Sequence, residues 1–274
     1  MEDVSIQGYG ITDRGLIRST NEDYYAVQDN LFLVADGMGG HNAGEIASKL
    51  TIETILMNMK DFFESNSIDN ESEEEYKNLI ISTIKKANNK IIQTAIKEPS
   101  YQGMGTTLIL ALFQKPNLIH IANVGDSRAY LFRENKLNMI SEDHSLANIM
   151  IDGFNLKNED VKSNFYQKYL TRAVGINSKI KPYYILIPMI PGDKILLCSD
   201  GLWNMIGEKE IMTILKKNIT DKLKCKKLIR KANELGGLDN ITAIIISVTE
   251  KIHHDKTGEK TFVFKSRKYL ERNY

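Results

Sequence analysis

Along this chain of 274 residues, strand-like runs are grouped with one another and helical stretches are grouped with one another, so the two types do not alternate. Three short runs rich in apolar and β-branched residues succeed each other at 106–113, 118–124 and 127–133, separated only by turn residues. Two helical patterns precede them, at about 43–63 and 76–97. Parallel strands would need a long crossover between them, usually a helix. This grouping therefore predicts an α+β fold with largely antiparallel sheets.

The remaining elements follow from the same patterns of apolar runs, turn residues and helical spacing. Strands are expected at 31–35, 183–188, 194–199 and 241–248, and helices at 208–217 and 221–235.

The composition is that of an ordinary folded protein, with 42% hydrophobic and 26% charged residues. Its formal net charge of +1 gives no electrostatic reason to expect nucleic acid or an anionic membrane as a partner. No apolar run approaches the roughly 20 residues of a membrane-spanning helix. Cys198 and Cys225 form neither a disulfide framework nor a zinc spacing. We therefore expect a cytoplasmic protein without a membrane span.

One domain is expected at residues 1–250, followed by a basic tail at 251–274. The tail holds seven Lys and Arg against three Asp and Glu, a net charge of +4, which leaves −3 for residues 1–250. We expect the tail to be a solvated terminus. A polar, irregular segment at about 143–169 predicts an inserted flap beside the core.

Four aspartates share one setting, at the end of an apolar strand-like run and close to glycine: Asp36, Asp126, Asp200 and Asp239. Each alone is also a common turn residue. Carboxylates gathered in one cleft repel each other and need cations to stay ionised. Ligation by oxygen atoms alone selects Mg²⁺ or Mn²⁺ over zinc. Four such residues together favour a divalent metal site.

A second charged cluster lies near the N-terminus and contains Arg18, Glu22 and Asp23. A guanidinium group presents a planar fork that suits two phosphate oxygens, and the two acids could hold water at a metal. Taken alone, the stretch is equally typical of an exposed loop in which an arginine pairs with a neighbouring acid.

Seven segments in this order resemble the metal-dependent protein phosphatase family of the 2C type, in its bacterial form: TDRGLIRSTNED, LFLVADGMGGHNAGEIAS, GMGTT, IANVGDSRAYLF, LTRAVG, ILLCSDGLW and GGLDNIT. The resemblance extends from about residue 8 to residue 248. It implies a β-sandwich of two antiparallel sheets flanked by pairs of antiparallel helices (α-β-β-α), with two Mn²⁺ or Mg²⁺ ions at one end. It also implies hydrolysis of phosphoserine and phosphothreonine in phosphoprotein substrates with metal-activated water, in opposition to a Ser/Thr protein kinase. We expect the protein to be a monomer.

Carried over motif by motif, the resemblance assigns five residues to the metal ions. It implies that Asp36 bridges two ions and that the carbonyl oxygen of Gly37 ligates one of them. Asp200 and Asp239 would complete the ligands of the second ion. Asp126, with Asp200, matches the positions that hold a third, weaker ion in bacterial members.

The N-terminal cluster also takes roles from the resemblance. It implies that Arg18 binds the substrate phosphate, that Glu22 contacts water at the metals and that Asp23 supports that water. Some members place a histidine directly after the Asp-Gly pair to protonate the leaving group, whereas this chain has Met38. His41 is the candidate general acid here, and a structural hydrogen-bonding role is the alternative.

Other phosphatase chemistries fail on the residues. A cysteine-based enzyme needs Arg six positions after Cys, but Cys198 leads to Asn204 and Cys225 leads to Lys231. No Asp-x-Asp follows a strand, and a P-loop reading fails at Glu45, where Lys is required. The remaining alternative is a phosphatase-like binding or regulatory module without turnover. The metal aspartates and the phosphate arginine are all present, which disfavours it.

Overall fold

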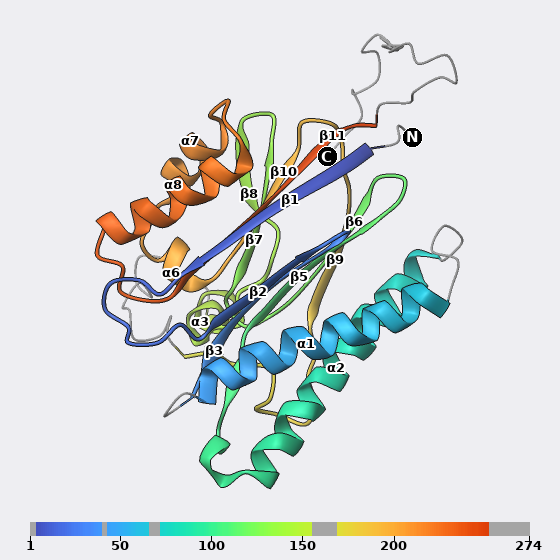
Figure 1. Cartoon of the computed structure of the whole chain (residues 1–274), viewed down its shortest axis with the longest axis vertical. Helices are drawn as coiled ribbons and strands as arrows, with labels where there is room; N and C mark the ends of the chain where they lie inside the picture. The colour runs from blue at the N-terminus through green and yellow to red at the C-terminus, as the bar shows by residue number, and fades with distance from the viewer. Residues whose placement is uncertain (1–3, 40–42, 66–71, 155–168, 252–274) are drawn as a thin grey trace.

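The computed structural model describes residues 4–39, 43–65, 72–154 and 169–251. Two antiparallel sheets stack face to face, and helices cover both outer faces (Figure 1). The four layers confirm the predicted α-β-β-α sandwich. Among the described residues, none of the helices combines the length and the apolar character that crossing a bilayer requires.

The first sheet has the order β1-β11-β10-β7-β8, and α6, α7 and α8 pack on its outer face. Its longest pair, the edge strand β1 and its neighbour β11, runs antiparallel from Val4 opposite Glu250 to Asp13 opposite Ile241. The bounds are β1 (Val4–Asp13), β7 (Arg128–Arg133), β8 (Lys136–Met139), β10 (Lys194–Cys198), α6 (Asp200–Trp203), α7 (Glu208–Leu215), α8 (Asp221–Glu234) and β11 (Ile241–Glu250).

The second sheet has the order β2-β3-β5-β6-β9, with β4 paired to β3, and the hairpin of α1 and α2 covers its outer face (Figure 1). The short elements η2 (Pro99–Tyr101) and α3 (Leu146–Phe154) lie in connecting segments. The bounds are β2 (Asp23–Gln28), β3 (Leu31–Met38), α1 (Ala43–Ser65), α2 (Glu73–Lys97), β4 (Gly105–Thr106), β5 (Leu108–Gln114), β6 (Leu118–Val124) and β9 (Tyr183–Pro188).

The strand β3 shows how both faces of a sheet are buried. Successive side chains of a strand point to opposite faces. Leu31, Leu33 and Ala35 pack in the cluster under α1 and α2. Phe32 and Val34 pack in the cluster between the two sheets. This double burial explains why the run LFLVA is continuously apolar instead of alternating with polar residues.

The structure contains elements that the sequence patterns do not predict: strands β1, β2 and β8 and the short helical elements η2, α3 and α6. Helix α2 begins at Glu73, three residues before the expected start, because a capping box fixes its first turn. In this box the Glu75 amide donates to Ser72 Oγ at 3.3 Å, and the Ser72 amide donates to Glu75 Oε2 at 2.6 Å.

Two predictions fall largely outside the described residues. The expected flap at about 143–169 includes residues 155–168, and the expected tail includes residues 252–274. Both assignments, and the domain boundary at residue 250, stay predictions.

Candidate functional site

Most of the predicted site residues line one cavity of about 640 Å³ at an end of the sandwich. Asp23 is buried beneath this cavity, and His41 lies outside the described residues. The predicted residues that line it are Arg18, Glu22, Asp36, Gly37, Asp126, Asp200 and Asp239.

The four aspartates reach the cavity from both sheets. Asp36 lies in β3 and Asp126 follows β6, and both strands belong to the second sheet. Asp200 begins α6 directly after β10, and Asp239 precedes β11, and both strands belong to the first sheet. The cavity therefore lies across the seam between the sheets.

Two threonines of the GMGTT segment hold the backbone at Asp36. The Asp36 amide donates to Thr107 Oγ1 at 3.0 Å, and the Thr107 amide donates to the Asp36 carbonyl at 2.8 Å. The hydroxyl of Thr106 donates to the same carbonyl at 2.8 Å. The Thr107 and Ser127 hydroxyl oxygens lie 2.7 Å apart, which ties this group to the segment after Asp126. The position of Asp36 is thus fixed by its neighbours in the sheet.

The start of α1 packs directly against the end of β3. A Cβ atom at Gly37 would lie 2.1 Å from the Gly44 carbonyl oxygen, and one at Gly44 would lie 2.5 Å from Glu22 Oε2. Contacts this short leave no room for a side chain at either glycine. The Gly37 amide also donates to the Glu22 carbonyl at 3.1 Å. The close approach places Glu22 beside the carboxylates of the cavity.

The carboxyl group of Asp23 joins the two sheets beneath the cavity. Asp23 begins β2, opposite Asp36 of β3. Its Oδ2 accepts from Ser199 Oγ at 2.7 Å and from Thr242 Oγ1 at 2.6 Å, and both donors belong to the first sheet or its edge. Its Oδ1 is buried without a hydrogen-bond partner among the described residues. Burial raises the pKa of Asp23 to about 7.

The side chain of Asn240 holds the loop that carries Arg18. Its Nδ2 donates to the carbonyl oxygens of Arg14 at 2.9 Å and Thr20 at 2.8 Å. Its Oδ1 accepts from the Glu22 amide at 2.8 Å. The sequence pattern singles out only the aspartate of the GGLDNIT segment and not this amide, although Asn240 directly follows that aspartate.

Arg18 points toward the carboxylates. Its Nη2 donates to Asp239 Oδ2 at 2.7 Å, and about half of its side chain is exposed, so solvent screens the ion pair. Burial opposes the charged form, but the negative charges of Asp239, Asp36 and Asp200 together raise the pKa of Arg18. The guanidinium group is therefore positively charged at the mouth of an acidic cavity.

The buried carboxyl groups hold their protons more tightly than ordinary acids. Burial, and then repulsion from neighbouring aspartates, raises the pKa of Asp36 and of Asp126 well above the usual range. Burial and Asp239 raise the pKa of Asp200 to about 6, and burial raises that of Glu22. If all of these carboxyl groups were ionised, the site would therefore have more negative charge than Arg18 compensates.

This arrangement fits divalent cations. The donor set consists of carboxylate and carbonyl oxygens, the ligands of Mn²⁺ and Mg²⁺. Asp200 Oδ1 is buried without a hydrogen-bond partner among the described residues, as expected of a ligand atom. Within the described ranges, no three Asp, Glu, His or Cys side chains form a ready-made cage around one point. The carboxylates line the walls of the cavity instead, so binding would require them to approach one another.

The opposite wall of the cavity comes from residues 169–177, which sequence reasoning did not assign to the site. Arg172, from the quoted LTRAVG segment, lines this wall, and its Nη1 lies 2.9 Å from His144 Nε2. Burial, and then Arg172, lowers the pKa of His144 to about 4, so His144 is neutral at pH 7. The Gly125 amide donates to His144 Nδ1 at 3.2 Å, which connects this wall to the backbone beside Asp126.

A tryptophan supports Asp126 from behind. Trp203 Nε1 donates to the Asp126 carbonyl at 3.0 Å. The guanidinium carbon of Arg128 lies 3.5 Å from the Trp203 ring centre, and Arg128 pairs with Asp143 at 2.6 Å. The VGDSR segment thus supplies Asp126, which lines the cavity, and also Arg128, which packs on the tryptophan that supports Asp126.

Comparison with known proteins identifies the family. The sequence model of the protein phosphatase 2C family matches residues 18–227. The serine/threonine phosphatase Stp of Listeria monocytogenes is 38% identical over 240 residues, which cover 86% of this chain and 93% of that protein.

Two solved structures agree with this match. The serine/threonine phosphatase Stp1 from Staphylococcus aureus superposes with a TM-score of 0.80 at 30% identity, covering 89% of this chain and 95% of that one. The catalytic domain of the phosphatase PstP, solved in complex with two manganese ions, superposes with a TM-score of 0.77 at 30% identity, covering 90% and 100%. On its sequence, fold and cavity, the chain belongs to the protein phosphatase 2C family.

Proposed function

We propose that this serine/threonine protein phosphatase hydrolyses phosphoserine and phosphothreonine with a pair of Mn²⁺ or Mg²⁺ ions bound in the acidic cavity. The observation that carries the proposal is the meeting of four aspartates from two sheets in one cavity that also holds Arg18. The two manganese ions of the PstP structure support a pair of ions. When bound, such ions lower the pKa of water and offset the charge of the phosphoryl oxygens.

The chain would hold the ions with the residues that line the cavity. Asp36 would bridge the pair and the carbonyl of Gly37 would add a ligand, while Asp200 and Asp239 would complete the set. Asp126, together with Asp200, would hold a third ion. Each carboxyl group must lose its proton to act as a ligand, so their raised pKa values make ion binding depend on pH.

The remaining residues act on phosphate and water. Arg18 would donate to two phosphate oxygens, since its guanidinium fork matches their spacing. Glu22 would orient the attacking water, and Asp23 would support this position from below. His41 is our candidate for protonating the leaving group. Positioning and charge compensation supply most of the acceleration in such reactions.

The biological setting is part of the same proposal. The substrates would be phosphoproteins of the cytoplasm, and the opposing enzyme would be a Ser/Thr protein kinase of the same cell. We further propose that the protein acts as a monomer, and that residues 1–250 form the catalytic domain.

The test is hydrolysis of para-nitrophenyl phosphate and of a phosphothreonine peptide by protein stripped with EDTA and then titrated with Mn²⁺ or Mg²⁺. We expect no turnover in EDTA and recovery with added metal. Asp239→Asn should lower kcat/KM by about 100-fold or more. Asp29→Asn, which makes the same change at a positive-φ turn outside the cavity, should leave kcat/KM unchanged.

Calorimetric titration with Mn²⁺ gives a readout besides activity. Two tight sites are expected, and a third, weaker site should disappear in Asp126→Asn. Full turnover in EDTA would refute the proposed chemistry. A protein that binds Mn²⁺ but hydrolyses neither substrate would establish the alternative, a binding module that retains the phosphatase fold.

A further inference from the structure

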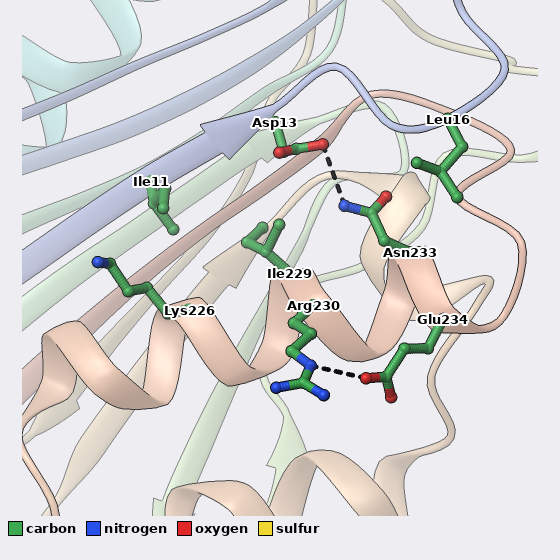
Figure 2. Close-up of a pocket in the computed structure, with 8 residues that line it drawn as sticks. All are labelled: Ile11, Asp13, Leu16, Lys226, Ile229, Arg230, Asn233 and Glu234. Carbon is green, nitrogen blue, oxygen red and sulfur yellow. Dashed lines mark hydrogen bonds and ion pairs between the residues drawn. The ribbon is translucent and has the colours of Figure 1, made fainter.

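A groove of about 440 Å³ lies on the outer surface between β1 and α8, and we call it the α8 groove (Figure 2). Ile11 and Asp13 of β1, Leu16 of the following loop, and Ile229 and Asn233 of α8 contribute to its lining. The Asn233 amide donates to Asp13 Oδ1 at 3.1 Å, which fixes α8 against the end of β1. None of the groove-lining residues lines the catalytic cavity, so the two sites are distinct.

Large aliphatic side chains beside the α8 groove face solvent. Leu16 is 64% exposed and Ile17 is 67% exposed, and both belong to the loop after β1. Leu238, in the loop before β11, is 58% exposed. Exposed aliphatic side chains that cluster in space mark contact surfaces more often than those scattered singly.

These side chains form a path from the α8 groove to the catalytic cavity. The Leu16 amide donates to the Gly237 carbonyl at 2.8 Å, so the two loops that carry the aliphatic residues lie side by side. Arg18 follows Leu16 by two residues, a separation of at most about 7 Å along the chain. Leu238 directly precedes Asp239, the partner of Arg18. A bound peptide can therefore contact the groove and the cavity at once.

The side of the groove formed by α8 is positively charged. Lys222, Lys226 and Arg230 are spaced by four residues and so share one face of the helix. Arg230 pairs with Glu234 at 2.7 Å, and Lys222 Nζ lies 6.0 Å from the ring centre of Tyr9. No carboxylate among the described residues pairs with Lys222 or Lys226. On this face the three cations stand against one carboxylate, Glu234, and Asp13 is the acid on the β1 side of the groove, so a small positive excess remains that favours an anionic partner.

The chain's own tail does not suit this groove. Residues 251–274 carry a net charge of +4, the same sign as the α8 face.

We propose that the α8 groove docks an acidic segment of the phosphoprotein substrate while the phosphorylated residue occupies the catalytic cavity. An aliphatic side chain of the segment packs on Leu16 and Ile229, and its carboxylates face Lys222 and Lys226. This inference rests on the proposed phosphatase activity and adds a selection for substrates with acidic and aliphatic residues near the phosphorylated position.

The test compares two phosphothreonine peptides with the same residues around the phosphate. One carries a flanking segment of Asp, Glu and Leu, and the other carries Ser and Gly there, with each flank tried on either side. We expect the acidic peptide to have a KM about fivefold lower, an effect that salt should weaken. Replacement of its Leu by Ser should remove part of the gain.

Charge reversal on the protein locates the effect. The double variant Lys222→Glu/Lys226→Glu should remove the preference for the acidic peptide and favour a Lys-flanked peptide. Its hydrolysis of para-nitrophenyl phosphate should be unchanged, because neither lysine lines the catalytic cavity. The matched control Lys85→Glu/Lys90→Glu makes the same change on exposed positions of α2, in the opposite helix layer, and should keep the preference.

Each outcome is decisive. Equal KM values for the two peptides in the wild-type protein, or an unchanged preference in the Lys222/Lys226 variant, would overturn the docking proposal alone. Absence of hydrolysis of para-nitrophenyl phosphate by the wild-type protein would overturn the phosphatase chemistry as well. A fluorescent oligonucleotide that binds more tightly than the acidic peptide, with loss in the same variant, would assign the groove to nucleic acid and overturn the proposal.

Discussion

The side chain of Asn240 connects three backbone segments of the site. It is 4% exposed and makes three hydrogen bonds of 2.8–2.9 Å, to Arg14, Thr20 and Glu22. Through them it determines where the loop with Arg18 and the backbone of Glu22 lie. Asn240 is therefore a residue that positions Arg18 and Glu22.

Asn240→Ala should therefore impair both stability and catalysis. Loss of three buried hydrogen bonds should lower the free energy of unfolding by about 3 kcal/mol, measured by urea denaturation. KM for para-nitrophenyl phosphate should rise, because the loop with Arg18 loses its anchors. Asn58→Ala removes an amide that donates to Thr54 on α1 and serves as the control, with KM unchanged. A wild-type KM in Asn240→Ala would show that the loop holds its position without this side chain.

The cavity aspartates could be predicted from the sequence because a charged residue beside an apolar run is conspicuous. Asp36 and Asp200 directly follow such runs. Asn240 and Thr107 could not be selected this way. They act through hydrogen bonds to the backbone of distant segments, and an uncharged polar residue at a strand end is common.

At the level of elements, the packing of α1 on β3 determines the shape of the site. The backbone of Gly37 and that of Gly44 approach too closely for a Cβ atom on either. The helix start and the strand end therefore act as one rigid unit.

Gly44→Ala should disturb this unit. Its methyl group would lie 2.5 Å from Glu22 Oε2 and 2.8 Å from the Gly37 carbonyl carbon, so Glu22 must move. We expect a loss of about 1–3 kcal/mol in the free energy of unfolding and a reduced kcat. Gly207→Ala, at the start of α7 with open space around its Cβ position, is the matched control. Unchanged kcat in Gly44→Ala would mean that the position of Glu22 is unimportant.

The elements that sequence reasoning missed have a physical explanation. β1 contains Gly8, which weakens the strand pattern, yet a Cβ atom there would lie 2.1 Å from the Phe32 ring. The glycine makes room for a core side chain that is distant in sequence. β2 is an edge strand with half-exposed residues and has no clear alternation. Buried strands such as β5 could be predicted because they form continuous runs of almost entirely apolar residues.

At the scale of the whole molecule, the buried acids link stability to pH. In the metal-free protein the pKa of Asp200 is about 6 and that of Asp23 about 7, both above the ordinary value of 3.8. The folded state therefore binds more protons than the unfolded state. Their contribution to stability is fully present below pH 3.8 and is lost as the pH rises through about 6 and 7.

The melting temperature of the metal-free protein should accordingly fall between about pH 4 and about pH 7. Saturating Mn²⁺ should reverse this trend, since cations bind the ionised carboxylates of the folded state only. Differential scanning fluorimetry with and without EDTA measures both. In Asp23→Asn the pH dependence should be smaller, and an unchanged slope would assign it to other groups.

The last described strand, β11, follows the site residues Asp239 and Asn240 and ends at Glu250. Deletion of residues 252–274 should therefore leave kcat and KM for para-nitrophenyl phosphate unchanged. A large loss of activity together with a lower melting temperature would show that the tail belongs to the folded domain.

The hydrogen bonds of Asp23 separate the part of the site that must stay constant from the part that can vary between such enzymes. The catalytic cavity lies between two stacked sheets that Asp23 connects. Its geometry is therefore fixed by the interior of the sandwich. The rim, by contrast, is made of connecting segments such as 14–19 and 169–177. Exchange of these segments between relatives, with Arg18 kept in place, should alter substrate choice while it preserves the reaction, which makes the molecule a modular scaffold for engineered phosphatases.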